Sequence, residues 1–341
     1  MKKTKLKIFL VTSYPENSLS LMDFYNSAFS ELKHQTRLVP ISERFRVVDR
    51  IKRQISRISY RGFDPDINGE RLINEFNIFK PDLTIICKGE RLKGEAIKYL
   101  RQNSKFGCIN IYTDSPMVNP GPGVSKMMSS MKEYTHVYTF ANSMIPVFYQ
   151  MGAKSVSRLA FGFDPNVHFP FRSSPPTYST DIAYFGSWGP FQEAWLNQIS
   201  NMKIKIYGTG WKHTKKESPI RYSIEENRGI GKNMSLAING ANLIINFVRA
   251  EHGCFHSMKT FEIPACGGFM VTNWTEEQAE FFDDDVHCVY FRSKEELLDK
   301  LDYYLKHETQ RKKIASAGLL AAANHTYINR AKQILNEIVY T

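Results

Sequence analysis

The sequence alternates short apolar runs with segments long enough to form helices, and it does so in both halves of the chain. In the first half the runs cover residues 6–12, 37–41, 82–87, 108–113 and 136–140. In the second half they cover residues 181–185, 203–207, 243–248, 268–272 and 287–291. Apolar runs bounded by Gly, Pro, Asn or Asp are typical of strands buried on both faces, as in parallel sheets. The pattern therefore predicts an α/β protein of two doubly wound, Rossmann-like domains.

A stretch without periodicity separates the two halves. Residues 172–180 are rich in Pro and Ser, and a new apolar run begins at Asp181. We therefore assign residues 1–165 to a first domain and residues 166–325 to a second. Ligands of such sheets bind beyond the carboxyl ends of the strands, so two domains facing each other would place two ligand sites across one cleft.

Length and composition fit this organisation. The 341 residues are enough for two domains, and a hydrophobic content of 42% excludes a disordered chain. No stretch approaches the roughly 18–20 apolar residues of a membrane-spanning helix. Lys5 and Lys7 alternate with apolar residues near the start, which favours a first buried strand over a secretory signal. We expect a cytoplasmic protein, and the odd number of five cysteines predicts reduced thiols.

The chain is basic, with a formal net charge of +11. Positive charge attracts the phosphates of sugar nucleotides, nucleic acids and lipid headgroups without distinguishing among them. Seven of the basic side chains lie in residues 44–61, where apolar residues recur at helical spacing. This segment is interpreted as a helix packed on its own domain, with a peripheral contact at the inner face of an anionic membrane, or with another polyanion, as the alternative.

Residues 252–272 carry the clearest chemical signal. Residues 257–266 predict a short helix, because the segment follows an apolar run and a Gly-Gly pair ends it. The start of a helix offers free N–H groups and a positive dipole end to a diphosphate. Lys259 adds a charge in the first turn, and Glu262 shares its helix face. The Glu262 carboxylate can there accept hydrogen bonds from both hydroxyls of a ribose.

At these residues the chain resembles the group 1 glycosyltransferases of the GT-B fold, especially the branch related to the spore maturation protein CgeB. The resemblance rests on Lys-Thr-Phe-Glu-Ile-Pro-Ala-Cys-Gly-Gly-Phe at residues 259–269, an acidic helix at 275–282 and a closing motif at 325–330. Residues 161–171 resemble the family's Gly-Val-Asp-Pro-x-x-Phe-x-Pro turn between domains. The likeness is strong over about residues 181–335 and weaker over residues 1–160.

The resemblance implies a set of donor-binding residues. Glu262 matches the ribose-binding glutamate, which is the second in the family's Glu–seven residues–Glu motif. Lys259 is the predicted catalytic residue at the helix start that holds the diphosphate. The other positions implied for donor binding are Ser257, Met258, Thr260, Gly186, Ser187, Arg228 and Ile230.

Two positions depart from the family pattern. Cys254 stands eight residues before Glu262, where the family has its first glutamate. Residues 189–195 contain no basic side chain, whereas many relatives have an Arg/Lys pair there. We therefore expect Lys259, helped by Arg228 or Lys232, to hold the phosphates.

Other candidate side chains also have simpler interpretations. His252, Cys254 and His256 alternate, but no fourth ligand is evident, so no metal site is predicted. Instead, we expect His256 to donate to a phosphate or a sugar hydroxyl. In the first domain Asp114 follows a strand and is either a turn residue or a catalytic carboxylate for an acceptor hydroxyl. The turns at residues 12–18 and 88–90 also follow strands and are candidates for acceptor contact.

The resemblance implies a retaining glycosyltransferase that uses a nucleoside-diphosphate sugar as donor, without a metal or a further cofactor. The acceptor is left open among a glycan, a lipid-linked intermediate, a protein and nucleic acid. Residues 326–341 are expected to form a helix packed back on the first domain. A non-catalytic GT-B-fold protein that binds a polyanion or glycan and a nucleotide-sugar epimerase remain the alternatives. Kinase, nicotinamide-dehydrogenase and zinc-finger functions lose their main support, since their sequence motifs are missing.

Overall fold

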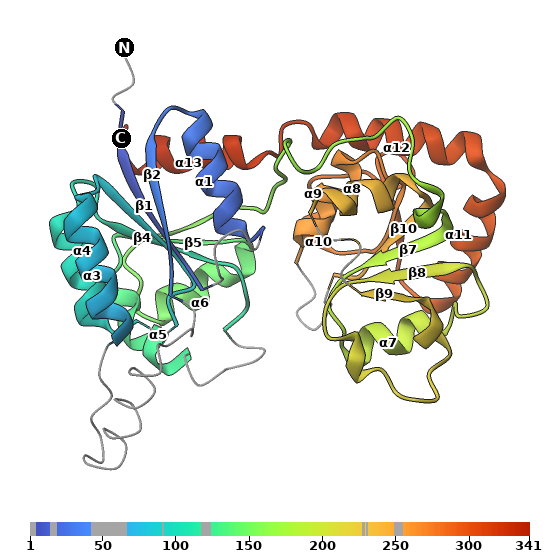
Figure 1. Ribbon diagram of the computed structural model, residues 1–341, viewed down its shortest axis with the longest axis horizontal. Helices are drawn as coiled ribbons and strands as arrows, with labels where there is room; N and C mark the ends of the chain where they lie inside the picture. Colours follow the sequence, from blue (N-terminus) through green and yellow to red (C-terminus); the bar gives the residue numbers. More distant parts are fainter. Residues whose placement is uncertain are drawn as a thin grey trace. The chain divides into compact units, whose positions relative to one another are not determined.

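The computed structural model describes residues 5–13, 19–41, 67–90, 92–116, 124–226, 229, 231–248 and 255–341. The chain divides into a first unit, Met1–Ala160 with Arg330–Thr341, and a second unit, Phe161–Asn329 (Figure 1). The sequence prediction had placed this boundary at residues 165/166 and the return of the chain at residue 326. The basic segment 44–61 lies outside the described residues.

The first unit is built on a six-stranded parallel sheet in the order β2-β1-β3-β4-β5-β6. Its strands are β1 Lys7–Thr12, β2 Gln35–Pro40, β3 Leu83–Cys87, β4 Cys108–Tyr112, β5 His136–Thr139 and β6 Val156–Arg158. Every residue of β3 and β4 is buried, as expected of strands covered by helices on both faces.

Helices flank this sheet on both sides. They are α1 Leu21–Glu31, α3 Ile67–Phe79, α4 Gly94–Asn103, α5 Val124–Ser130, α6 Ile145–Gln150 and α13 Tyr327–Ile338. Figure 1 shows α3 and α4 on one side of the strands and α1 on the other. The C-terminal helix α13 is tied to β5 and β6, because Tyr138 Oη donates to Glu337 Oε2 at 2.8 Å and Gln333 Nε2 donates to the Arg158 carbonyl at 3.1 Å.

The second unit contains another six-stranded parallel sheet, in the order β12-β11-β10-β7-β8-β9. Its strands are β7 Thr180–Phe185, β8 Ile204–Tyr207, β9 Ile224–Glu226, β10 Ala241–Asn246, β11 Met270–Asn273 and β12 Val289–Phe291. Counted from the first strand of this unit, the order from β9 is 3-2-1-4-5-6, which is the usual order of the Rossmann fold. The strand order reverses between β7 and β10.

The helices of the second unit also cover both faces. They are α7 Pro190–Asn197, α8 Lys232–Asn239, α9 Met258–Ala265, α10 Glu276–Ala279, α11 Lys294–Lys306 and α12 Glu308–Ala322. Leu196 of α7 and Leu297 of α11 pack into one buried cluster with Leu243 of β10, and each such side chain contributes about 1.5–3 kcal/mol by leaving water. Figure 1 shows α8 and α9 on the opposite side of the strands from α7. No helix among the described residues combines the length and apolarity needed to cross a bilayer.

The two Rossmann-like domains predicted from the apolar runs are confirmed. Each predicted run overlaps one observed strand, whereas β6 and β9 were not predicted. Both are three-residue strands at a sheet edge, and they contain polar residues such as Arg158 and Glu225. An edge strand is buried on fewer sides, so its sequence lacks the continuous apolar run on which the prediction depended.

The described cysteines are buried and free, in line with the expectation of reduced thiols. They are Cys87, Cys108, Cys266 and Cys288. Burial raises the pKa of the Cys87 and Cys266 thiols to about 12. These thiols are therefore protonated at neutral pH and are poor nucleophiles.

Two glycines after β8 allow a test of the turn beside the strand reversal. Gly208 and Gly210 have φ values of +144° and +81°. A Cβ atom on Gly208 would lie 2.0 Å from the Gly186 carbonyl oxygen, whereas one on Gly210 would have its nearest contact at 3.5 Å. We expect Gly208→Ala to lower the free energy of unfolding by about 3 kcal/mol or more and Gly210→Ala by about 1 kcal/mol. Urea unfolding followed by circular dichroism measures both free energies of unfolding. Equal losses of stability in the two variants would contradict the close approach of the turn after β8 to the turn after β7.

Candidate functional site

The candidate site of the second unit lies at the carboxyl ends of β7 and β10, where the strand order reverses. Open α/β sheets bind ligands at this point. Gly186 and Ser187 follow β7, and the chain after β10 leads to α9. The Gly186 carbonyl accepts a hydrogen bond of 2.9 Å from Trp211 Nε1, while Ser187 is exposed with its hydroxyl 3.1 Å from Thr209 Oγ1. The turn is thus fixed by its neighbours and presents Ser187 to solvent.

Helix α9 begins and ends close to the predicted residues. Ser257 is its N-cap and Cys266 its C-cap, and Gly267 follows with a φ of +75°. The Ser257 backbone N–H donates to Thr260 Oγ1 at 3.1 Å, and the Thr260 hydroxyl donates to Gln278 Oε1 at 3.0 Å. Thr260 is fully buried, and these two bonds anchor the start of the helix. Its contact with a donor stays a prediction.

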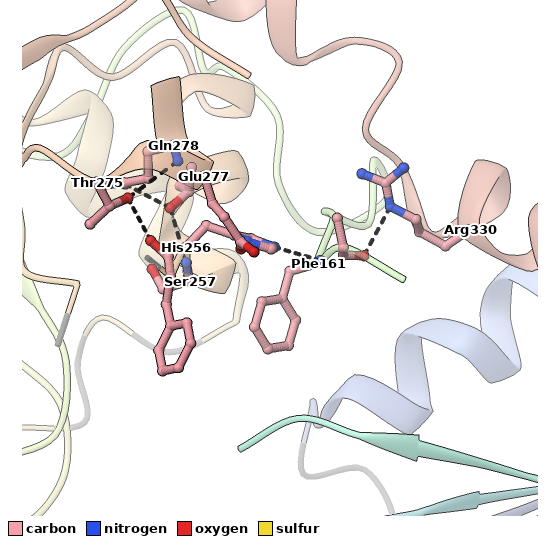
Figure 2. A network of polar contacts seen from close by, with 10 residues as sticks. Phe161, His256, Ser257, Thr275, Glu277, Gln278 and Arg330 are labelled. Atoms are coloured by element: carbon pink, nitrogen blue, oxygen red, sulfur yellow. Dashed lines mark hydrogen bonds and ion pairs between the residues drawn. The ribbon is translucent and has the colours of Figure 1, made fainter. Parts of the chain in front are cut away.

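A buried polar network fixes the start of α9. Gln278 Oε1 accepts hydrogen bonds from Thr260, from Thr272 Oγ1 at 3.3 Å and from Asn246 Nδ2 at 3.4 Å. Thr275 caps α10 by accepting from the Gln278 backbone N–H at 3.2 Å (Figure 2). Sequence reasoning missed Asn246 and Thr272. Asn246 is the last residue of β10, and Thr272 is the second to last of β11. A polar side chain near the carboxyl end of a buried strand is the signal that would have identified them.

Lys259, Glu262 and His168 form the charged centre of the site. Lys259 Nζ lies 2.6 Å from Glu262 Oε2, and His168 Nε2 lies 3.6 Å from Glu262 Oε1. The Glu262 side chain is 2% exposed and that of His168 is 3% exposed, whereas that of Lys259 is 27% exposed. The predicted proximity of Lys259 and Glu262 is confirmed. His168 was not predicted to belong to the site.

The electrostatic environment keeps Glu262 ionised. Burial acts to raise the pKa of this carboxyl, but the Lys259 ammonium and His168 together hold it below its ordinary value. Burial lowers the pKa of His168, so its ring is neutral at neutral pH. His168 Nδ1 accepts a hydrogen bond of 3.3 Å from the Asp164 backbone N–H, and in the neutral ring Nε2 therefore carries the proton.

His256 lies within the protein and not at its surface. Its Nε2 accepts a hydrogen bond of 3.1 Å from the Phe161 backbone N–H, and its Nδ1 lies 2.8 Å from Glu277 Oε2 (Figure 2). Its side chain is fully buried, and Phe161 and Phe281 pack against the ring with centroids 5.5 and 5.2 Å away. Both nitrogens are thus bonded within the unit, so a contact with a phosphate would require one of these bonds to break. These bonds anchor the ring within the unit, and the catalytic role of His256 stays a prediction.

The other predicted donor residues are only partly described. Met258 is half-buried in the first turn of α9, and Lys232 begins α8. Arg228, Ile230 and Cys254 lie outside the described residues. Within the ranges given above, no group of three His, Cys, Asp or Glu side chains is placed to hold a metal ion.

In the first unit, Asp114 forms an ion pair with Lys88 at the carboxyl ends of β3 and β4. The Asp114 side chain is 58% exposed, and that of Lys88 is 20% exposed. Lys88 has a φ of +63°, and Tyr112 Oη donates to Glu90 Oε1 at 2.8 Å. The turn at residues 88–90 and Asp114 therefore lie together. The catalytic role of Asp114 stays a prediction, and residues 14–18 lie outside the described chain.

The charged centre predicts an acid-sensitive contribution to stability. Because the pKa of Glu262 is below its ordinary value of 4.5 in the folded protein, its ionised form stabilises the fold above that value. This contribution is lost as the pH falls through the lowered pKa. We expect Glu262→Gln to lower the free energy of unfolding at pH 7 by about 2 kcal/mol, and we expect the difference from the parent to vanish in strong acid. Urea unfolding between about pH 3 and pH 8 measures this difference in the free energy of unfolding, because carboxylates and histidines titrate in roughly that range.

Glu308→Gln is the control for this prediction. Glu308 pairs with Lys312 on α12, but both side chains are largely exposed, at 64% and 75%. Such pairs contribute little, so the control should unfold like the parent at every pH. A Glu262→Gln variant as stable as the parent at pH 7 would contradict the favourable pairing of Glu262.

Comparisons with known proteins agree with this architecture. Residues 190–336 match a family model described as glycosyl transferase-like. The crystal structure of HepE from Anabaena in complex with UDP-glucose has a TM-score of 0.67 and 13% identity, covering 98% of this chain and 100% of that chain. None of the curated proteins matches the chain significantly.

Two further solved structures have the same fold. The N-terminal domain of trehalose-6-phosphate phosphatase from Candida albicans has a TM-score of 0.69 and 11% identity, covering 100% of this chain and 98% of that chain. Sucrose-phosphate synthase from Thermosynechococcus elongatus has a TM-score of 0.64 and 9% identity, covering 98% of each chain. The chain therefore has the fold of the GT-B glycosyltransferases, and the match over residues 190–336 supports a glycosyltransferase.

Proposed function

We propose that the chain is a glycosyltransferase that binds a nucleoside-diphosphate sugar in its second unit. The observation that carries this proposal is the buried, ionised carboxylate of Glu262, one turn from the start of α9 and beside the Lys259 ammonium. A buried carboxylate is costly unless it is paired, and it suits a ligand that offers it hydroxyl groups. The two neighbouring hydroxyls of a ribose match its two oxygens.

The start of α9 supplies the complementary site for the diphosphate. The first N–H groups of a helix have no partners within the helix and carry partial positive charge. Lys259 Nζ has three N–H donors, of which Glu262 takes one. The same ammonium can therefore hold Glu262 and a phosphate oxygen together. In this arrangement the ribose and the diphosphate bind on either side of Lys259.

The chemistry follows from this arrangement. When the bond between the sugar and the diphosphate breaks, negative charge develops on the departing phosphate. The dipole of α9 and the Lys259 ammonium stabilise that charge in place, without reorganisation of solvent. The protein otherwise acts by holding donor and acceptor in a reactive geometry. No metal ion is required in this scheme, because the helix and the ammonium neutralise the leaving group.

The finer assignments rest on sequence resemblance. The proposed reaction retains the anomeric configuration, and the proposed branch is the one related to CgeB. The first unit would hold the acceptor, with Lys88 and Asp114 beside an acceptor hydroxyl. A glycan, lipid-linked intermediate, protein or nucleic acid remains the proposed acceptor, and the proposed location is the cytoplasm or, through residues 44–61, the inner face of the membrane. The bound UDP-glucose of the Anabaena protein makes UDP-sugars the first donors to test.

Removal of the Lys259 ammonium provides the first test. The ligand is UDP or, if another of UDP, GDP, ADP and CDP binds more tightly, that nucleotide. We expect Lys259→Ala to weaken its binding by about 10- to 100-fold, because one or two charge-assisted hydrogen bonds are lost. Binding of the matching nucleoside without phosphates should weaken by less. Isothermal titration calorimetry measures both affinities.

Lys300→Ala is the matched control. The Lys300 side chain is 21% exposed and pairs with Glu296 on α11 at 2.9 Å, so its burial and pairing resemble those of Lys259. It has no proposed contact with the donor and should bind nucleotides like the parent. Equal weakening of nucleotide and nucleoside binding in Lys259→Ala would show that the lysine acts on Glu262 alone.

The reaction itself is tested with UDP-sugars and candidate acceptors. We expect slow release of UDP without an acceptor and faster release with one, and proton NMR of the product should show the anomeric configuration of the donor. An inverted product would refute retention. A changed sugar nucleotide formed without an acceptor would indicate an epimerase. Binding without any turnover would favour the non-catalytic alternative.

A further inference from the structure

The side chain of His168 lies beside the buried carboxylate of Glu262. Residues 162–170 resemble the turn pattern Gly-Val-Asp-Pro-x-x-Phe-x-Pro, but Phe163 stands in place of Val and His168 in place of Phe. An imidazole in place of a phenyl ring brings two polar nitrogens into a buried site. His168 is 3% exposed, so these nitrogens need partners within the protein.

The turn itself holds the His168 ring. The backbone N–H of His168 donates to the Asp164 carbonyl at 2.8 Å, and Nδ1 accepts from the Asp164 backbone N–H at 3.3 Å. The Asp164 carboxylate accepts a hydrogen bond of 2.8 Å at Oδ1 from the Asn166 backbone N–H. The ring is therefore fixed through Nδ1, and its Nε2 lies 3.6 Å from Glu262 Oε1.

Lys259 and His168 lie beside different oxygens of the same carboxylate. Lys259 Nζ contacts Oε2 at 2.6 Å, whereas His168 Nε2 faces Oε1. Each carboxylate oxygen can accept about two hydrogen bonds, so each keeps one direction free for a ligand. A neighbour beside each oxygen restricts rotation of the carboxylate before any ligand binds.

We propose that His168 is a positioning residue that orients the Glu262 carboxylate so that both of its oxygens accept the two hydroxyls of the donor ribose. This inference rests on the proposed function, because it assigns the selectivity of the same site. It makes His168 the residue that separates ribonucleotides from nucleotides without these hydroxyls. His168 touches Glu262 and not the reacting atoms.

The positioning depends on the protonation state of the ring. In the neutral ring Nδ1 accepts from Asp164, but a protonated Nδ1 would face the Asp164 N–H with a second N–H, and the bond would be lost. The charged groups around the ring are Glu262, Lys259 and Asp164, and burial outweighs them in lowering the pKa of His168. The ribose preference should therefore hold at neutral pH and decline below the ordinary histidine value of 6.5.

The test compares UDP with 2′,3′-dideoxy-UDP by calorimetry; if another of the four diphosphates binds more tightly, it and its dideoxy form are used. We expect His168→Phe to weaken binding of the ribonucleotide about tenfold, the value of one well-placed hydrogen bond. The affinity for the dideoxy form should stay within about twofold of that of the parent protein. A difference of this size is the scatter expected when a substitution is not coupled to the ligand's contacts. His168→Gln, whose amide N–H can occupy the place of Nε2–H, should restore most of the preference and remove its decline in acid.

Two results would overturn the proposal. The first is equal weakening of both nucleotides by His168→Phe, which a merely structural role would produce. The second comes from urea unfolding of the free protein with His168→Phe, Glu262→Gln and the double variant. A contact between these residues requires the double variant to lose less stability than the sum of the single losses. Additive losses would refute His168 as a partner of Glu262.

The two readouts separate this inference from the proposed function. If the parent binds none of the nucleoside diphosphates, the proposed donor site fails and the ribose role of His168 fails with it, whereas the unfolding cycle still reports on the contact. If the parent binds a nucleotide and the cycle is additive, only the role of His168 fails. Phe is the family's residue at this position, so the His168→Phe variant should fold.

Discussion

The structure of the second unit depends on how the charge of one buried carboxylate is compensated. Glu262 is 2% exposed, and a lone charge at that depth would be costly enough to force its protonation. Lys259, on the same helix, and His168, in the turn at the start of the second unit, lie on two sides of the carboxylate and stabilise its ionised form. This pairing links α9 to the turn at which the second unit begins. It also leaves an ordered pair of acceptor oxygens beside a helix start, which is why a ligand with hydroxyls and phosphates suits it.

The surrounding structure serves to fix the start of α9. The usual Rossmann strand order places this helix after β10, at the point where the strand order reverses. Gln278 then bonds to Thr260 on α9 and to Thr272 on β11. His256 bonds to the Phe161 backbone and to Glu277 on α10 (Figure 2). Because these groups are buried and bonded, movement of the helix start would break several hydrogen bonds together. A preorganised helix start binds an anion without an ordering cost.

The sequence predicted those features that depend on local pattern. Continuous apolar runs located the interior strands, and the Gly-Gly pair after Cys266 located the end of α9. Edge strands such as β6 were not predicted, because a strand exposed along one side needs no apolar run. Side-chain partners were less predictable. His256 stands next to the N-cap in sequence, yet its ring turns inward to Phe161, 95 residues away. His168 joins Glu262 only because the fold brings the turn against α9, and no local pattern reveals a contact over that separation.

The central claim is that Glu262 and the start of α9 together bind a nucleoside diphosphate. A crystal structure of the chain with a bound nucleoside diphosphate tests it most directly. The account predicts both ribose hydroxyls within hydrogen-bond distance of the Glu262 oxygens and the diphosphate against the backbone N–H groups that begin α9, with Lys259 Nζ between them. A nucleotide bound elsewhere, with Glu262 still contacting only Lys259 and His168, would contradict it.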